Sequence, residues 1–342
     1  MATKPTYAWE TLPDEQLLDI RLRDLNVTID GTWIEECLEA LYGELARREL
    51  PLRPHAWLAT QWFTPRGVPG IGIPFYLAHP RLIKLERKQM RDVEGSTRAE
   101  MMKILRHETG HVLDNAYAIG KDPRVTAQFG RWRKRYPQQY TPNPASRRYV
   151  QHLRLYYAQA HPHEDFAETF AVILGARGNA WRRQYARWPA LEKLELVNTI
   201  LEELRGKTPK RRNKRRVDAI DTNDMTLREY YADKHSRYDA SFPGMFDDEL
   251  RRLFSDDPKH RHRELASHFL RRNRTEIRKL VSNWTGDYQY TRDQVLHDMI
   301  GRSRELKLRA TGPERRLKME FAILLTVKTM DVHLRRRNSF AL

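Results

Sequence analysis

The chain has 342 residues, of which 40% are hydrophobic, so it can bury a substantial core in one large domain or two smaller ones. Its single cysteine, Cys37, excludes a disulfide framework and a zinc site built from cysteines alone, so histidine and carboxylate side chains must hold any zinc. The formal net charge of +17 would attract nucleic acid, anionic membrane surfaces or acidic proteins, but it does not say which of these is the partner.

The N-terminal segment is not expected to act as a targeting signal. Its first twenty residues, MATKPTYAWETLPDEQLLDI, contain no apolar run behind a basic patch, and no stretch of 18 apolar residues occurs anywhere in the chain. We therefore expect a cytoplasmic protein without membrane insertion. The next segment, TWIEECLEALYGELARRE at residues 32–49, predicts a helix in which Cys37 is a small buried residue rather than a catalytic thiol.

A stretch punctuated by glycine and proline follows. TPRGVPGIGIPFYLAHPRLIKLE, residues 64–86, alternates short apolar runs with turn residues and predicts two or three strands. An exposed edge of the strand pair around Ile71 to Leu85 could accept an extended peptide as an added strand.

The next predicted helix begins near Thr97. TRAE places Glu100 three residues after Thr97, which is a capping-box pattern, and the next helix breaker is Gly120. A buried face of the helix is predicted by apolar residues at three-to-four-residue spacing: Met101, Ile104, Leu105, Val112, Ala116 and Ile119.

The segment LRHETGH, residues 105–111, contains the pattern His-Glu-x-x-His. His107 and His111 are four residues apart and therefore lie one turn apart on one helix face, where two imidazoles can bind one ion. Glu108 could take a proton from a water that zinc makes acidic. A third ligand six residues after His111 is excluded, because that position is Tyr117.

A second helix could supply the missing ligand. In HPHEDFAETFAVILG, residues 161–175, Pro162 suits a first helical position and Gly175 suits a helix end. Glu164 and Glu168 lie on one face of this helix, so Glu164 could bind the metal while Glu168 accepts a hydrogen bond from a ligand histidine.

These motifs resemble a known family. RHETGH together with YAQAHPHEDFAETFA is similar to the zinc-binding metallopeptidases of bacteria, within the gluzincin class, and more distantly to the anthrax-lethal-factor-like proteases. The similarity covers most of residues 10–200, including GVPGIGIPFYLAHPRL. It implies a zincin-like fold, with a small sheet packed on the active-site helix. It also implies that Glu164 is the third ligand and that Tyr157, seven residues earlier, stabilises the tetrahedral intermediate.

Several neighbouring residues offer alternatives to these roles. His161 and His163 could bind the metal or assist an oxyanion, and Glu168 could be the ligand if the helix is rotated. Tyr156 competes with its neighbour for the catalytic role, and Asp114, three residues after the second histidine, could support a ligand or lie on the surface.

The last third of the chain changes in character. Apolar periodicity stops in the basic segment 205–224, which predicts a solvated linker. Beyond it, three segments show helical spacing of apolar residues: 247–254, 263–284 and 314–336. Residues 201–342 hold 33 Lys and Arg against 22 Asp and Glu, which gives them +11 of the net charge.

The predicted organisation is an α+β metallopeptidase domain at residues 1–204, a basic linker at 205–224 and a helical C-terminal appendage at 225–342. The predicted function is peptide-bond hydrolysis with one zinc ion per chain and Glu108 as general base. The alternative is a protein that binds nucleic acid or an acidic partner through its basic C-terminal region, with a zinc site that is structural or that acts on proteins held on DNA.

Overall fold

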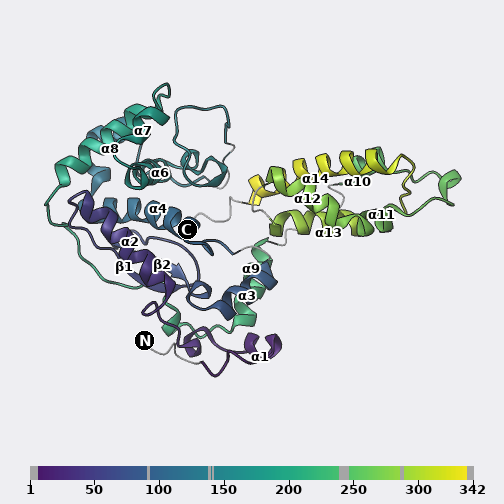
Figure 1. Cartoon of the computed structure of the whole chain (residues 1–342), viewed down its shortest axis with the longest axis horizontal. Helices are drawn as coiled ribbons and strands as arrows, with labels where there is room; N and C mark the ends of the chain where they lie inside the picture. Colours follow the sequence, from purple (N-terminus) through teal and green to yellow (C-terminus); the bar gives the residue numbers. More distant parts are fainter. Residues whose placement is uncertain are drawn as a thin grey trace. The chain divides into compact units, whose positions relative to one another are not determined.

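A computed structural model describes residues 7–90, 93–137, 140, 142–238, 246–285 and 289–336 (Figure 1). Within them the chain forms two compact units, the first made of residues 7–88 and 93–231 and the second of residues 232–336 with 89–90. The described residues are mostly helical and contain one two-stranded sheet, which confirms the predicted α+β class.

The first unit contains most of the helices and the sheet. Its elements are α1 Asp14–Leu18, α2 Trp33–Arg47, β1 His55–Ala59, β2 Gly70–Pro74, α3 Pro80–Met90, α4 Arg98–Tyr117, α5 Pro123–Phe129, α6 Pro162–Gly175, α7 Ala180–Gln184, α8 Ala190–Leu204 and the beginning of α9 Leu227–Tyr238. Cys37 is fully buried on α2.

The sheet is small, and each of its outer edges carries an isolated bridge to another segment. β1 and β2 are parallel, with His55 opposite Gly70. Phe63 forms an antiparallel bridge with Gly72 on the outer edge of β2, and Ala219 forms one with Ala59 of β1. Neither strand therefore offers a fully open edge.

This arrangement corrects two expectations for residues 64–86. Only β2 is a strand there, because the apolar residues beyond it have helical rather than alternating spacing. Leu82 and Leu85, three residues apart, are both fully buried on α3. The open strand edge expected between Ile71 and Leu85 is wrong, since Phe63 already pairs with Gly72.

The α4 helix begins as its sequence predicts and ends at Tyr117, so Ile119 lies beyond it, in the 3-10 helix Ile119–Lys121. Thr97 is the N-cap, and its hydroxyl oxygen accepts a hydrogen bond from the backbone N–H of Glu100 at 3.2 Å. The Glu100 carboxylate accepts a hydrogen bond from Arg154. At the other end Ala118 adopts a left-handed conformation with φ 60°, which terminates the helix two residues before Gly120.

The α6 helix matches its predicted bounds. His161 is the N-cap, with its Nδ1 accepting from the N–H of His163 at 3.1 Å, and Pro162 occupies the first helical position. Ten of the side chains that follow are buried, including those of Glu164 and Glu168. Buried carboxylates need partners, so this helix must face polar groups of the neighbouring elements.

Gly110 lets α4 and α6 approach closely. A Cβ atom added at Gly110 would lie 2.6 Å from Cα and 3.0 Å from Cβ of Ala167, which is closer than the two helix backbones could tolerate. The glycine sits between His107 and His111, so the contact also sets the distance from these histidines to α6.

We expect Gly110→Ala to push the two helices apart. The free energy of unfolding should fall by about 1–3 kcal/mol, because the added methyl group overpacks the contact with Ala167. Gly43→Ala is the control: its new Cβ would meet only the flexible end of Arg47, at 3.7 Å, and removing a helical glycine stabilises by about 0.5–1 kcal/mol. Urea denaturation measures both variants, and equal midpoints would contradict the inferred contact.

The basic side chains of residues 205–224 are solvated, and the backbone of this segment lies along the first unit. The N–H groups of Lys210 and Arg211 both donate to the carbonyl of Ala116, at 2.9 and 3.1 Å. The division between the compact units falls at residue 231 rather than in this segment. Hydrogen bonds from the backbone of this segment to the end of α4, and its bridge to β1, hold it in place although it lacks apolar periodicity.

The second unit is a helical bundle around its own apolar core. Beyond α9 it contains α10 Asp247–Leu253, α11 Ala266–Arg272, α12 Arg274–Thr285, α13 Gln289–Glu305 and α14 Glu314–Arg336. The helix predicted over 263–284 is divided at Asn273, whose side-chain amide donates to the carbonyl of Phe269. The α13 helix was not predicted. No helix in the described ranges is long and apolar enough to cross a membrane.

Candidate metal centre

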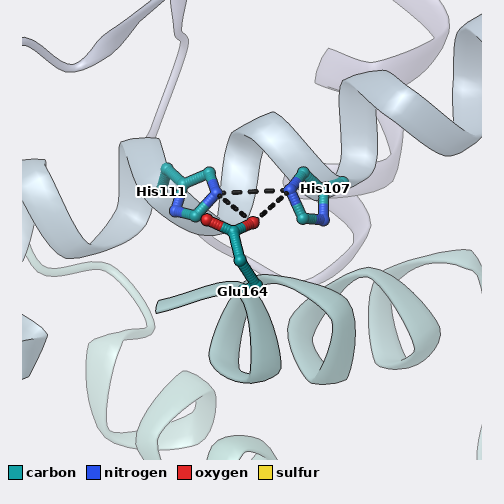
Figure 2. Close-up of side chains that lie close together, drawn as sticks. All are labelled: His107, His111 and Glu164. Atoms are coloured by element: carbon teal, nitrogen blue, oxygen red, sulfur yellow. Dashed lines mark hydrogen bonds and ion pairs between the residues drawn. The ribbon is translucent and has the colours of Figure 1, made fainter. Parts of the chain in front are cut away.

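Two histidines of α4 and one glutamate of α6 converge on a single point (Figure 2). Oε2 of Glu164 lies 3.1 Å from Nε2 of His107 and 3.3 Å from Nε2 of His111, and the two Nε2 atoms are 3.2 Å apart. Ligands about 2.0–2.1 Å from a tetrahedral zinc ion are about 3.3 Å from one another. The donor types and their spacing therefore fit zinc, with a fourth position open to water.

Glu168 fixes the orientation of the first histidine. Its Oε1 lies 2.8 Å from Nδ1 of His107, and its Oε2 accepts a hydrogen bond from the N–H of Leu153. Both carboxylate oxygens are thus engaged away from the point of convergence. A carboxylate on Nδ1 leaves Nε2 available as the ligand atom and raises its basicity.

The charges of the metal-free cluster are coupled. Burial alone lowers the pKa of His107, but its hydrogen bonds with Glu164 and Glu168 outweigh burial and raise that pKa well above 6.5. Burial raises the pKa of Glu164, but the charge of His111 and the hydrogen bonds from both histidines hold that pKa well below 4.5. In the metal-free protein, protonated His107 is thus a buried cation beside the buried carboxylates of Glu164 and Glu168. A bound divalent ion would take over this positive charge.

Glu108 lies between the two histidines in sequence and is nearly buried, with 7% of its surface exposed. Its Oε2 accepts a hydrogen bond from the hydroxyl of Thr64 at 2.9 Å. The loop that carries Thr64 is fastened to α4 by Asn115, whose amide donates to the carbonyls of Pro65 and Val68. Thr64 was not identified from the sequence, because nothing in its local pattern relates it to a residue 44 positions away.

Tyr136 is a second group that the sequence did not reveal. Its hydroxyl donates to Oε1 of Glu164 at 2.8 Å, so this oxygen is engaged while Oε2 faces the histidines. The Tyr136 ring stacks on His161 with centroids 3.8 Å apart. Burial and the charge of Glu164 raise the pKa of Tyr136 far above 10, so the phenol is a hydrogen-bond donor at any physiological pH.

The predicted Tyr157 lies beside the cluster, in the short 3-10 helix Arg154–Gln159. Its ring centroid is 5.5 Å from that of His107. Tyr156 adopts a left-handed backbone conformation with φ 57°. The catalytic role of Tyr157 stays a prediction.

The alternative residues surround the site without joining the ligand set. The Nε2 atom of His161 contacts the carbonyl of Lys134 at 2.8 Å, and burial lowers the pKa of His163 to about 4. The ring of Trp132 packs on His163, and its indole N–H donates to Asp114. Asp114 also accepts from the N–H of Gly120, so it holds the loop after α4.

Comparison with known proteins bears on this site. Residues 83–182 match the model of a family described as "Putative zinc-binding metallo-peptidase". The match includes all of α4 and α6, with the three residues of the metal cluster, and leaves residues 232–336 outside it. Neither the curated proteins nor the solved structures contain a match. The family description supports zinc as the metal and a protein or peptide as the substrate.

We expect zinc binding to release a proton, because the ion requires neutral His107, whose pKa is raised in the metal-free protein. The raised pKa stabilises the metal-free fold below pH 6.5, and this contribution is lost as pH rises through the pKa of the folded state. Apparent zinc affinity should therefore rise with pH, with about one proton released per ion near pH 7. Titration calorimetry in buffers of different ionisation enthalpy measures the release, and identical heats in all buffers would contradict it.

Proposed function

We propose that this chain is a zinc-dependent peptidase of the gluzincin type, with a zincin-like fold in its first unit. The observation that carries the proposal is the convergence of His107, His111 and Glu164 at the mutual spacing of tetrahedral zinc ligands, with Glu108 adjacent to the first of them. Zinc bound there would lower the pKa of a water molecule and polarise a carbonyl group.

The protein side chains divide the remaining work. Glu108 accepts the proton of the attacking water, and the hydroxyl of Thr64 holds its carboxylate in place. Glu168 keeps the His107 ring in the orientation that presents Nε2. Tyr157 donates a hydrogen bond to the oxyanion that develops on the substrate carbonyl.

Metal analysis combined with a peptide digest tests the proposal. Wild-type protein purified without chelator should contain about one zinc per chain, as a three-ligand site implies, and His111→Ala and Glu164→Ala should contain much less. A mixed peptide library incubated with the zinc-loaded protein should be cleaved, with cleavage abolished by a chelator and restored by zinc. Absence of zinc from the wild type, or a zinc-loaded protein that cleaves no peptide, would refute the assignment.

A further inference from the structure

The segment 207–216, here called the basic strip, is a densely charged part of the first unit outside the metal centre. Seven of its ten residues are basic and none is acidic: Lys207, Lys210, Arg211, Arg212, Lys214, Arg215 and Arg216. All seven are exposed. The metal centre uses none of them.

The backbone of the basic strip is held in place at its start, in its middle and at its far end. At its start, the N–H of Gly206 donates to the carbonyl of Glu49 at 2.9 Å, and the hydroxyl of Tyr117 donates to the carbonyl of Lys207 at 2.8 Å. In its middle, two successive N–H groups donate to the carbonyl of Ala116.

Two aromatic side chains of β1 hold the far end. Nε2 of His55 contacts the carbonyl of Arg215 at 3.2 Å, and the indole of Trp57 donates to the carbonyl of Val217 at 2.8 Å. The chain then forms the bridge between Ala219 and β1. A charge run that serves only solubility needs no such fixation, whereas a binding surface gains affinity when the fold has already ordered its backbone.

The charges of the basic strip are largely uncompensated. Arg216 pairs with Asp221 at 2.7 Å. For the other six cations, the described part of the chain provides no ion pair and no side-chain hydrogen bond. Like charges this close repel one another, so an external anion would relieve the repulsion.

The composition of the basic strip favours one kind of polyanion. Protein interfaces have an apolar core with aromatic anchors, and here the apolar contribution is a single proline, Pro209. A phosphodiester backbone can be bound by cationic side chains spaced along its phosphates, without an apolar contact. Arginine binds phosphate through two parallel hydrogen bonds. Ten residues span at most about 35 Å, which corresponds to about ten phosphates along one DNA strand.

We propose that the basic strip binds the phosphate backbone of a nucleic acid. The strip crosses the end of α4 at Ala116, five residues beyond His111 and therefore about 8 Å further along the helix axis. Bound nucleic acid would thus pass close to the metal centre. If the chain is the peptidase proposed above, its substrates are proteins held on nucleic acid, but the binding itself does not depend on that activity.

Fluorescence anisotropy with the full chain tests the proposal, using a labelled 20-nucleotide single strand and a 20-base-pair duplex over a range of salt concentrations. The strip variant is Arg212→Glu with Lys214→Glu and Arg215→Glu. The control variant reverses three exposed arginines outside the strip, Arg183, Arg187 and Arg304, and so has the same net charge. A neutral version of the strip variant, with glutamine at the three positions, covers the case in which charge reversal impairs folding.

Wild type should bind at least one probe, with the two probes distinguishing single from double strands. The strip variant should bind at least about tenfold more weakly than wild type, while the control variant should change affinity little. The slope of log affinity against log salt concentration should fall by the equivalent of up to about three phosphate contacts in the strip variant. Equal losses in the strip and control variants, or no binding by wild type, would overturn the proposal. So would tighter binding to polyglutamate or to phosphatidylserine vesicles. Zinc content and peptide cleavage, measured separately, show whether the peptidase assignment fails independently.

Discussion

Glu108→Gln is expected to abolish peptide cleavage while leaving the metal in place. Glutamine has nearly the same shape as glutamate and can still accept the hydrogen bond from Thr64, but it cannot take a proton from water. Loss of a positioned general base lowers kcat/KM by about 10²–10⁴-fold. The ligand atoms are untouched, so zinc content by elemental analysis should equal that of the wild type.

Glu100→Gln is the matched control for this substitution. Glu100 lies on the same helix and also accepts a hydrogen bond, but from Arg154 at the helix N-terminus rather than from Thr64. It should leave kcat/KM and zinc content unchanged. If Glu108→Gln retained full activity, Glu108 would not be the base. If it lost zinc as well as activity, its role would be in building the site.

The two site helices could be predicted from sequence because their signals are local. Thr97 caps α4, and Pro162 and Gly175 bound α6 as expected, since each of these residues acts on the backbone within a few positions of itself. Helical periodicity then places His107 and His111 on one face. That Glu164 meets them required the two helices to pack, which the family resemblance implied and the structure describes.

The groups around the ligands could not be predicted in the same way. Tyr136 lies in a segment without periodicity, and Thr64 reaches Glu108 across 44 positions of sequence. The prediction of two or three strands in residues 64–86 is wrong in part, because short apolar runs between turn residues fit a strand or a helix equally well. The composition of residues 205–224 predicts a linker, whereas the contacts of this segment with the first unit are made by its backbone, which side-chain composition does not report.

A buried ion pair anchors α6, and it too was absent from the sequence prediction. Nζ of Lys193 on α8 lies 2.6 Å from Oδ2 of Asp165 and 2.9 Å from the carbonyl of Arg148. Both side chains are nearly inaccessible, with 8% of Lys193 and 2% of Asp165 exposed. Asp165 directly follows Glu164, so the pair ties the ligand-bearing turn of α6 to α8.

Lys193→Met should lower the free energy of unfolding by about 3–5 kcal/mol, because it leaves the Asp165 carboxylate buried without its cation. Urea denaturation measures the loss. The exposed pair between Arg182 and Glu195 provides the control, and Arg182→Met should have a much smaller effect because solvent screens that pair. An equal loss in the two variants would show that the buried pair is not a special anchor.

The pH dependence and a double variant separate charge from packing. Burial raises the pKa of Asp165 to about 7 even beside Lys193, and without the lysine that pKa rises further. A raised carboxyl pKa means that the folded protein binds the proton more tightly than the unfolded chain does. The cost of burying the ionised carboxylate therefore lowers the free energy of unfolding in full above the folded pKa, and this cost declines as pH falls. The loss of unfolding free energy in Lys193→Met, taken relative to wild type at each pH, should therefore be smaller at pH 6 than at pH 8.

The double variant Asp165→Asn with Lys193→Met should lose less unfolding free energy than the sum of the two single variants, because neither charge is then left unpaired. Strict additivity, together with a loss independent of pH, would instead assign the effect to packing alone.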